Sequence, residues 1–223
     1  YNATTPLAPS VLQIINETLR DAWGNPSSSH IAGKTAKEVI NVARSRVAKM
    51  VGAQEEDIIF TSGGTEANNT VFLSILKHFN MFYKTEDSEK YLPHVITSNI
   101  EHDSVLLSIE NLVEEGYCEK SVVGVSTTTG MVDVDEIMKE IKSNTCLVSI
   151  MMANNESGVI QPISDVVSRL RKLQCDRDQS GYPKIFVHTD AAQTIGKLKV
   201  DVSELGVDYL TIVGHKFYGP RIG

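Results

Sequence analysis

The sequence predicts an α/β fold with a mostly parallel central sheet and helices on both faces. Short apolar runs alternate with longer amphipathic segments along the 223 residues of the chain. Most of the short runs are apolar throughout, which is typical of strands buried on both faces of a parallel sheet. The alternation of strand and helix then favours right-handed crossover connections between parallel strands.

Six runs are expected to form the strands. They are DIIFTS (57–62), HVITS (94–98), SVVGVS (121–126), CLVSIMMA (146–153), KIFVHTD (184–190) and DYLTIVG (208–214). Helices are expected where apolar residues recur at helical spacing, over 11–23, 35–51, 65–79, 103–115, 134–141 and 163–173. Pro162 comes directly before the last of these, and proline suits a helix start because its missing N–H costs nothing there.

Few other features interrupt this alternation. Residues 1–10 are expected to form an extended arm, and residues 11–223 one large domain. The polar segments 84–90 and 176–181 are interpreted as surface insertions. The chain has no initial methionine and stops inside an apolar, glycine-bearing stretch, so we interpret it as part of a longer protein that is cut before a second, smaller domain.

Composition excludes several classes of protein. The chain has 21 basic and 28 acidic residues, for a net charge of -7, without a lysine–arginine cluster, which argues against nucleic acid as a partner. No apolar stretch approaches the ~18 residues of a membrane span, so no membrane association is expected. Cys118, Cys146 and Cys175 are widely spaced, which favours a reducing compartment and structural roles over disulfides or zinc. The expected location is the cytosol; a mitochondrial one stays open, because any targeting peptide would precede Tyr1.

Five of the six predicted strands are followed at once by a polar or glycine-bearing cluster. The clusters are GGTEANN, NIEHDS, NNESG, the pair Asp190 and Gln193, and GHKFYG. The carboxyl ends of parallel strands share one edge of the sheet, and open α/β sheets bind ligands there. The clusters therefore predict a single site.

The glycine cluster suggests a phosphate site. Gly63 and Gly64 lead into Thr65 and a predicted helix, whose free N–H groups and dipole attract anions. The lysine of a Walker loop is missing, and a plain turn is the alternative.

Lys216 and Asp190 are the candidate reactive groups. Lysines are commonly solvated surface charges, but one beside His215 and two aromatic residues in a cleft would be desolvated, and its neutral amine could form a Schiff base. Asp190 ends an apolar strand, where it could cap the next segment or face a cationic ring nitrogen of pyridoxal phosphate.

The remaining clusters hold His102 and two asparagines. His102 could cap a turn, or lie on a cofactor ring as an acid/base group. Asn154 and Asn155 favour a turn, yet amide donors at this edge could also bond a phenolate oxygen.

Taken in order, these motifs resemble those of a known family. TSGGTEANN, EHDSV, ANNESGV, HTDAAQ and GHKFYGP look like the class V aminotransferases, and more narrowly the cysteine desulfurases and selenocysteine lyases. YNATTPL at the start and GNPSS at 24–28 are similar to the amino-terminal arm and the active-site loop of the same group. The resemblance covers essentially the whole chain.

The resemblance implies fold type I of the pyridoxal-phosphate enzymes and a homodimer with active sites at the subunit interface. Lys216 would bind the cofactor as a Schiff base and move protons, Asp190 would pair with the ring nitrogen, and His102 would stack on the ring. Gln193 and Asn155 would contact the phenolic oxygen of the cofactor. Gly64, Thr65 and His215 would hold the phosphate.

The implied reaction removes selenium from L-selenocysteine, or sulfur from cysteine, and leaves L-alanine, with a possible acceptor protein for the released atom. GHKFYGPRIG and the long segment 172–183 look more like animal selenocysteine lyases. A cysteine desulfurase that forms an enzyme persulfide is the alternative, and a transaminase or a non-catalytic scaffold comes behind both.

Two departures from the family pattern matter. Val213 stands where many desulfurases have a phosphate-binding serine. The family's catalytic cysteine and its arginine for the substrate carboxylate are both expected beyond Gly223.

Overall fold

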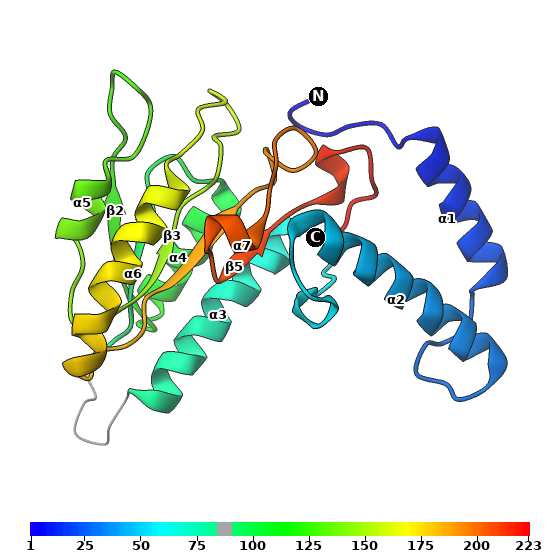
Figure 1. Ribbon diagram of the computed structural model, residues 1–223, viewed down its shortest axis with the longest axis horizontal. Helices are drawn as coiled ribbons and strands as arrows, with labels where there is room; N and C mark the ends of the chain where they lie inside the picture. Colours follow the sequence, from blue (N-terminus) through cyan, green and yellow to red (C-terminus); the bar gives the residue numbers. More distant parts are fainter. Residues whose placement is uncertain (84–90) are drawn as a thin grey trace.

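The computed structural model describes residues 1–83 and 91–223, so the predicted insertion at 84–90 lies outside the described residues. Figure 1 shows a central sheet flanked by helices, with two helices extending to one side. The strands are β1 (His94–Ser98), β2 (Glu119–Val123), β3 (Thr145–Ser149), β4 (Phe186–Asp190) and β5 (Tyr209–Thr211). The α-helices are α1 (Pro9–Asp21), α2 (Ile31–Val51), α3 (Gly64–Phe82), α4 (Asp103–Glu114), α5 (Val134–Lys139), α6 (Ile163–Gln179) and α7 (Val202–Leu205).

The sheet is parallel throughout, in the order β2-β1-β3-β4-β5. β1 and β3 are buried along their whole length, as their continuous apolar runs predict. The predicted α/β class with a parallel sheet is therefore confirmed.

The two faces of the sheet pack against different helices. Ile96, Val148 and Val187 belong to a core that includes residues of α5 and α6. Their strand neighbours Val95 and Leu147 belong to a second core with α3 and α4. Because successive strand residues point to opposite faces, the same short runs fill both cores. This packing holds the carboxyl ends of the strands in one row.

The prediction of a strand at 57–62 is wrong. Residues Glu55–Asp57 form a short 3-10 helix, and the residues after it run extended without joining the sheet. Ile59 is 70% exposed. A strand needs a partner, and in the described part of the chain Thr61 exchanges backbone hydrogen bonds with Gly223 alone, at 2.8 and 3.3 Å.

The interpretation of 176–181 as a surface insertion is also wrong in part. Helix α6 continues through Gln179, and Arg177 is only 5% exposed. Its guanidinium donates hydrogen bonds of 2.9 to 3.3 Å to four backbone carbonyl oxygens, those of Lys142, Ser143, Thr145 and Pro183. Arg177 thus satisfies the carbonyl groups that lead into β3 and β4.

Replacing Arg177 with methionine is expected to lower the free energy of unfolding by about 3 kcal/mol, because buried carbonyl groups would lose their donors. Chemical denaturation measures the change. Arg169→Met on the same helix is the control, since Arg169 is exposed and makes one surface ion pair with Asp135, worth less than about 1 kcal/mol. Equal effects of the two substitutions would contradict this role of Arg177.

The helices at the amino-terminal end leave the body of the sheet. α1 begins at Pro9, inside the predicted arm, because proline fits the first turn of a helix. None of its residues is buried, and Leu19 and Trp23 are more than 70% exposed at its end. Across residues 1–83 and 91–223, no helix combines the length and apolar character that crossing a bilayer would require.

Candidate active site

The carboxyl ends of the strands surround a cavity of about 130 Å³. All eight residues predicted for the site line this cavity. They are Gly64, Thr65, His102, Asn155, Asp190, Gln193, His215 and Lys216. They come from the start of α3 and from the segments that follow β1, β3, β4 and β5, so the fold brings together groups that are far apart in sequence.

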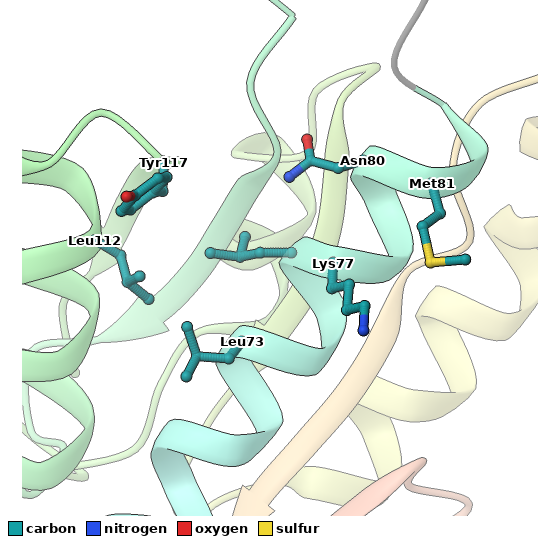
Figure 2. Close-up of a pocket in the computed structure, with 7 residues that line it drawn as sticks. Leu73, Lys77, Asn80, Met81, Leu112 and Tyr117 are labelled. Carbon is teal, nitrogen blue, oxygen red and sulfur yellow. The ribbon is translucent and has the colours of Figure 1, made fainter.

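A larger cavity of about 370 Å³ lies elsewhere, between α3 and α4. Figure 2 shows Leu73 of α3 pointing towards Leu112, whereas Met81 points away from Leu112 and Tyr117. Its lining contains one charged group, Lys77, and otherwise apolar or amide side chains with a single phenol. The smaller cavity is the better candidate for chemistry because it gathers a carboxylate, an amine and two imidazoles.

The glycine cluster forms the start of α3 at the cavity wall. A Cβ atom on Gly64 would lie 2.7 Å from Cγ1 of Val213, which is closer than atoms in contact allow. Val213 also lines the cavity, so the residue that departs from the desulfurase pattern packs against the glycine. Because α3 begins at Gly64, and Gly64 and Thr65 line the cavity, the positive end of the helix dipole faces the cavity, as an anion site requires.

Lys216 ends a short 3-10 helix (Gly214–Lys216) after β5. Its Nζ donates hydrogen bonds to the carbonyl oxygens of Asn2 (2.8 Å) and Ala3 (2.9 Å). Partial burial lowers the pKa of Lys216, and the positive charges of Lys197 and Arg221 lower it further, against the opposing effect of Asp190. A lowered pKa favours the neutral amine that a Schiff base needs.

The amino-terminal arm reaches this lysine from across the molecule. The backbone N–H of Thr5 donates to the carbonyl oxygen of His215 at 2.8 Å, and Nε2 of Gln193 donates to that of Asn2 at 3.1 Å. Figure 1 shows the chain start beside the red segment that carries Lys216. Residues 24–28, which resemble an active-site loop, are not among the lining residues and lie between α1 and α2, far from the sheet.

Asp190 is held by both of its carboxylate oxygens. It ends β4 and is 7% exposed. Oδ1 accepts a hydrogen bond from the backbone N–H of Ala192 (2.9 Å), and Oδ2 accepts one from Nδ2 of Asn68 (3.1 Å). The carboxylate therefore both supports the following turn and presents a fixed negative charge at the cavity.

His102 combines the two roles that the sequence left open, whereas the two asparagines each take one of theirs. His102 is the N-cap of α4, where its Nδ1 accepts from the backbone N–H of Ser104 at 3.1 Å, and it also lines the cavity. Asn154 builds the turn, because its Oδ1 accepts from Glu156 and Ser157. Asn155 is left at the cavity wall.

Sequence reasoning missed several polar groups at the site. Asn68 and Ser104 bridge Asp190 and His102, and the carbonyl oxygens of the arm contact Lys216. Helical spacing was the available signal for Asn68, since it lies four residues after Gly64 on the same helix face. The arm offered no such signal, because its contact with Lys216 is made by backbone atoms.

A second buried carboxyl lies near Asp190. Glu101 is 6% exposed, and burial raises its pKa to about 8, helped by the charge of Asp190. Its Oε1 accepts hydrogen bonds from Ser98 Oγ (2.5 Å) and from the backbone N–H of Met151 (2.9 Å). Glu101 is therefore protonated at neutral pH in the folded protein.

The raised pKa of Glu101 predicts how stability depends on pH. The unfolded chain releases this proton near pH 4.5 and the folded protein near pH 8, so the stabilisation is lost as pH rises through that window. Glu101→Gln is expected to remove the dependence and to gain about 1.4 kcal/mol per pH unit relative to the parent between pH 5 and 8. Urea unfolding across this range measures it. Parallel curves for the two proteins would contradict the assignment.

The cysteines take no part in the cavity. Cys118 and Cys146 are buried, and burial raises the pKa of these thiols to about 11 and about 12. Cys175 is exposed on α6. The three cysteines thus lie outside the lining of the cavity, and the raised pKa disfavours the thiolate form of Cys118 and Cys146 near neutral pH. In the described ranges, no three histidine, cysteine or acidic side chains gather as a metal site would require.

Comparison with known proteins shows the family of the chain. The sequence matches the family described as "Aminotransferase class-V" over residues 1–222. It is 56% identical to the selenocysteine lyase of Xenopus tropicalis and 41% identical to the cysteine desulfurase IscS of Dictyoglomus turgidum, over 100% and 99% of this chain. A solved structure titled "NIFS-LIKE PROTEIN" aligns with all of this chain at a TM-score of 0.85 and 36% identity.

These matches extend over only part of each relative. The chain spans about half of their own length, 52% and 51% for the two relatives and 56% for the solved structure. Within that half, the match includes every strand and every cluster of the candidate site. The chain belongs to the class V aminotransferase family.

Proposed function

We propose that this chain is the cofactor-binding part of a pyridoxal-phosphate-dependent selenocysteine lyase, which removes selenium from L-selenocysteine and leaves L-alanine. The observation that carries the proposal is one cavity that joins Lys216, Asp190 and His102 at the strand ends. The 56% identity to a protein named selenocysteine lyase supports the choice of substrate.

The residues of the cavity fit pyridoxal phosphate group by group. The start of α3 at Gly64 and Thr65, together with His215, suits a phosphate. Asp190 suits the ring nitrogen, and Asn155 with Gln193 suits the phenolic oxygen. The closeness of Val213 at Gly64 is consistent with the fit, because a Cβ at position 64 would clash with Val213 and displace the helix start from the cavity wall.

Asp190 and Lys216 would each carry out a different part of the reaction. Bound pyridoxal phosphate supplies a cationic ring that takes up electrons released at the substrate α-carbon. Asp190 would keep the ring nitrogen protonated. Lys216 would release the cofactor to the substrate amine, accept the α-proton at Nζ and return a proton to the product.

A cysteine desulfurase is the second candidate. It is supported by the 41% identity to the cysteine desulfurase IscS of Dictyoglomus turgidum. The same cavity would serve both reactions, so the two candidates differ in chalcogen preference and in whether a persulfide forms on the enzyme.

The proposal extends to assembly and location. A homodimer is supported by the exposed apolar side chains of α1 and by the distance of 24–28 from the cavity of its own chain. A selenium or sulfur acceptor protein would take the released atom. We further propose the cytosol as the location, with neither nucleic acid nor membrane as a partner.

The test uses protein expressed from its complete coding sequence. It is expected to purify yellow, and borohydride reduction is expected to fix the cofactor onto Lys216, as peptide mass spectrometry detects. With dithiothreitol added as the two-electron reductant that liberates selenide or sulfide, these products and alanine are then measured with L-selenocysteine and with L-cysteine. A label on another lysine, or on none, would refute the cofactor site. Faster release of sulfide would favour the desulfurase.

A further inference from the structure

Asn68 is a buried polar side chain to which the proposed reaction assigns no role. It is fully buried on α3, one turn after Gly64. Its Nδ2 donates to two acceptors, Oδ2 of Asp190 at 3.1 Å and Oγ of Ser104 at 2.8 Å. Its Oδ1 is buried and has no hydrogen-bond partner in the part of the chain that the structure describes.

The chemistry of its neighbours fixes the orientation of this amide. A carboxylate only accepts hydrogen bonds, so the NH2 group must face Asp190. Turning the amide over would set Oδ1 against the carboxylate and replace an attraction with a repulsion. The orientation therefore leaves Oδ1 without a partner and keeps both donors of Asn68 in use.

The second donor determines what Ser104 offers to His102. Because Ser104 Oγ accepts from Asn68, its own proton is free to point at His102 Nδ1, which lies 2.9 Å away. The backbone N–H of Ser104 points at the same nitrogen, at 3.1 Å. Two donors facing Nδ1 exclude a proton there, so the neutral ring carries its proton on Nε2.

We propose that Asn68 is a positioning residue that joins the two sides of the site: it orients the Asp190 carboxylate directly and, through Ser104, holds His102 as the neutral Nε2–H tautomer. This inference rests on the proposed function for its link to the cofactor. The tautomer itself follows from the protein's own contacts. His102 would thus meet its ligand as a hydrogen-bond donor from Nε2.

The first experiment needs no substitution. Two-bond ¹H–¹⁵N correlation spectra of protein labelled with ¹⁵N in the histidine rings report which ring nitrogen carries a proton. His102→Gln assigns the signal among the six histidines of the chain. At pH 8, with or without added cofactor, the Nδ1 of His102 is expected to be unprotonated. A proton on Nδ1 would overturn the proposal even if the cofactor binds as proposed.

The second experiment separates the two hydrogen bonds of Asn68, to Asp190 and to Ser104. Asn68→Ala removes both contacts and is expected to shift the pH midpoint of the bound cofactor's visible absorbance by about one unit, the effect of one hydrogen bond to a charged group. It should also broaden or move the His102 signal. Ser104→Ala keeps the contact with Asp190, so it should change the His102 signal without moving the midpoint.

Asn69→Ala is the matched control, because Asn69 is the next residue on α3 and, within residues 1–83 and 91–223, its side chain bonds the backbone oxygen of Thr65 and not the cavity groups. It should change neither readout. Asn68→Asp keeps the shape of the side chain but places a carboxyl group beside Asp190. This variant replaces Asn68→Ala in the experiment if the alanine variant does not fold. It should move the midpoint further than Asn68→Ala does.

Lower thermal stability of the Asn68 variants, with an unchanged midpoint and an unchanged His102 signal, would assign Asn68 a purely structural role and overturn the proposal. Failure of the parent protein to bind pyridoxal phosphate would instead refute the proposed function, and the tautomer measurement would still decide the contacts of His102.

Discussion

Replacing Lys216 with alanine is expected to abolish turnover, with a loss of roughly 10⁴-fold or more. The substitution removes both the amine that would bind the cofactor and the group that would move the α-proton, and proton transfer alone contributes about 10²- to 10⁴-fold. The measurement is the rate of alanine formation from L-selenocysteine. Borohydride reduction of the variant should leave no cofactor attached to the protein.

Lys139→Ala is the control for this substitution, because Lys139 is an exposed residue of α5 that pairs with Glu136 on the surface. It should keep full activity. A small added amine should restore part of the activity of Lys216→Ala by replacing the lost proton acceptor. Turnover of Lys216→Ala near the parent rate would mean that another lysine holds the cofactor.

Asp190→Asn is expected to lower turnover by roughly a hundredfold while much of the cofactor stays bound. In the proposed function the carboxylate would provide a negative charge beside the ring nitrogen, and losing such a charge raises the barrier by about 3 kcal/mol. Turnover and cofactor content are measured on the same preparation. The amide can still accept from the N–H of Ala192, so the turn after β4 should survive.

Asp178→Asn is the control for Asp190, because Asp178 is near the exposed end of α6 and accepts a hydrogen bond from Gln174 within that helix. It should leave turnover unchanged. Loss of the cofactor from Asp190→Asn, in proportion to the loss of rate, would point to a binding role in place of an electronic one. Near-normal turnover would assign the ring-nitrogen role to another residue.

The sequence was sufficient to predict which residues gather at the sheet edge. Asp190 and Lys216 follow apolar runs at the point where each run ends, and parallel pairing then brings those ends together. The local signals at His102 and Asn154 were correct as well, since one caps a helix and the other builds a turn.

Other features depend on partners that lie far away in the chain. Residues 57–62 have the composition of a strand, but in the described part of the chain their backbone bonds are local except at Thr61, which pairs with Gly223. Arg177 has a polar, surface-like sequence neighbourhood and is buried because four carbonyl groups from other segments need donors. Helical spacing puts Asn68 on the same face as Gly64, but its role comes from contacts with Ser104 and Asp190, which are far away in the sequence.

The contact between the amino-terminal arm and Lys216 has a consequence for how the protein is made. The hydrogen bond from Lys216 to Asn2 joins residues that are 214 positions apart, whereas β1 and β2 pair across a short connection. Contacts between distant residues carry the largest loop-closure cost and form late in folding. During synthesis, the arm leaves the ribosome before Lys216 and must wait until this lysine, 214 positions after Asn2, has also been made. The reactive amine should therefore be the last part of this half to become ordered, and attachment of the cofactor would mark its completed folding.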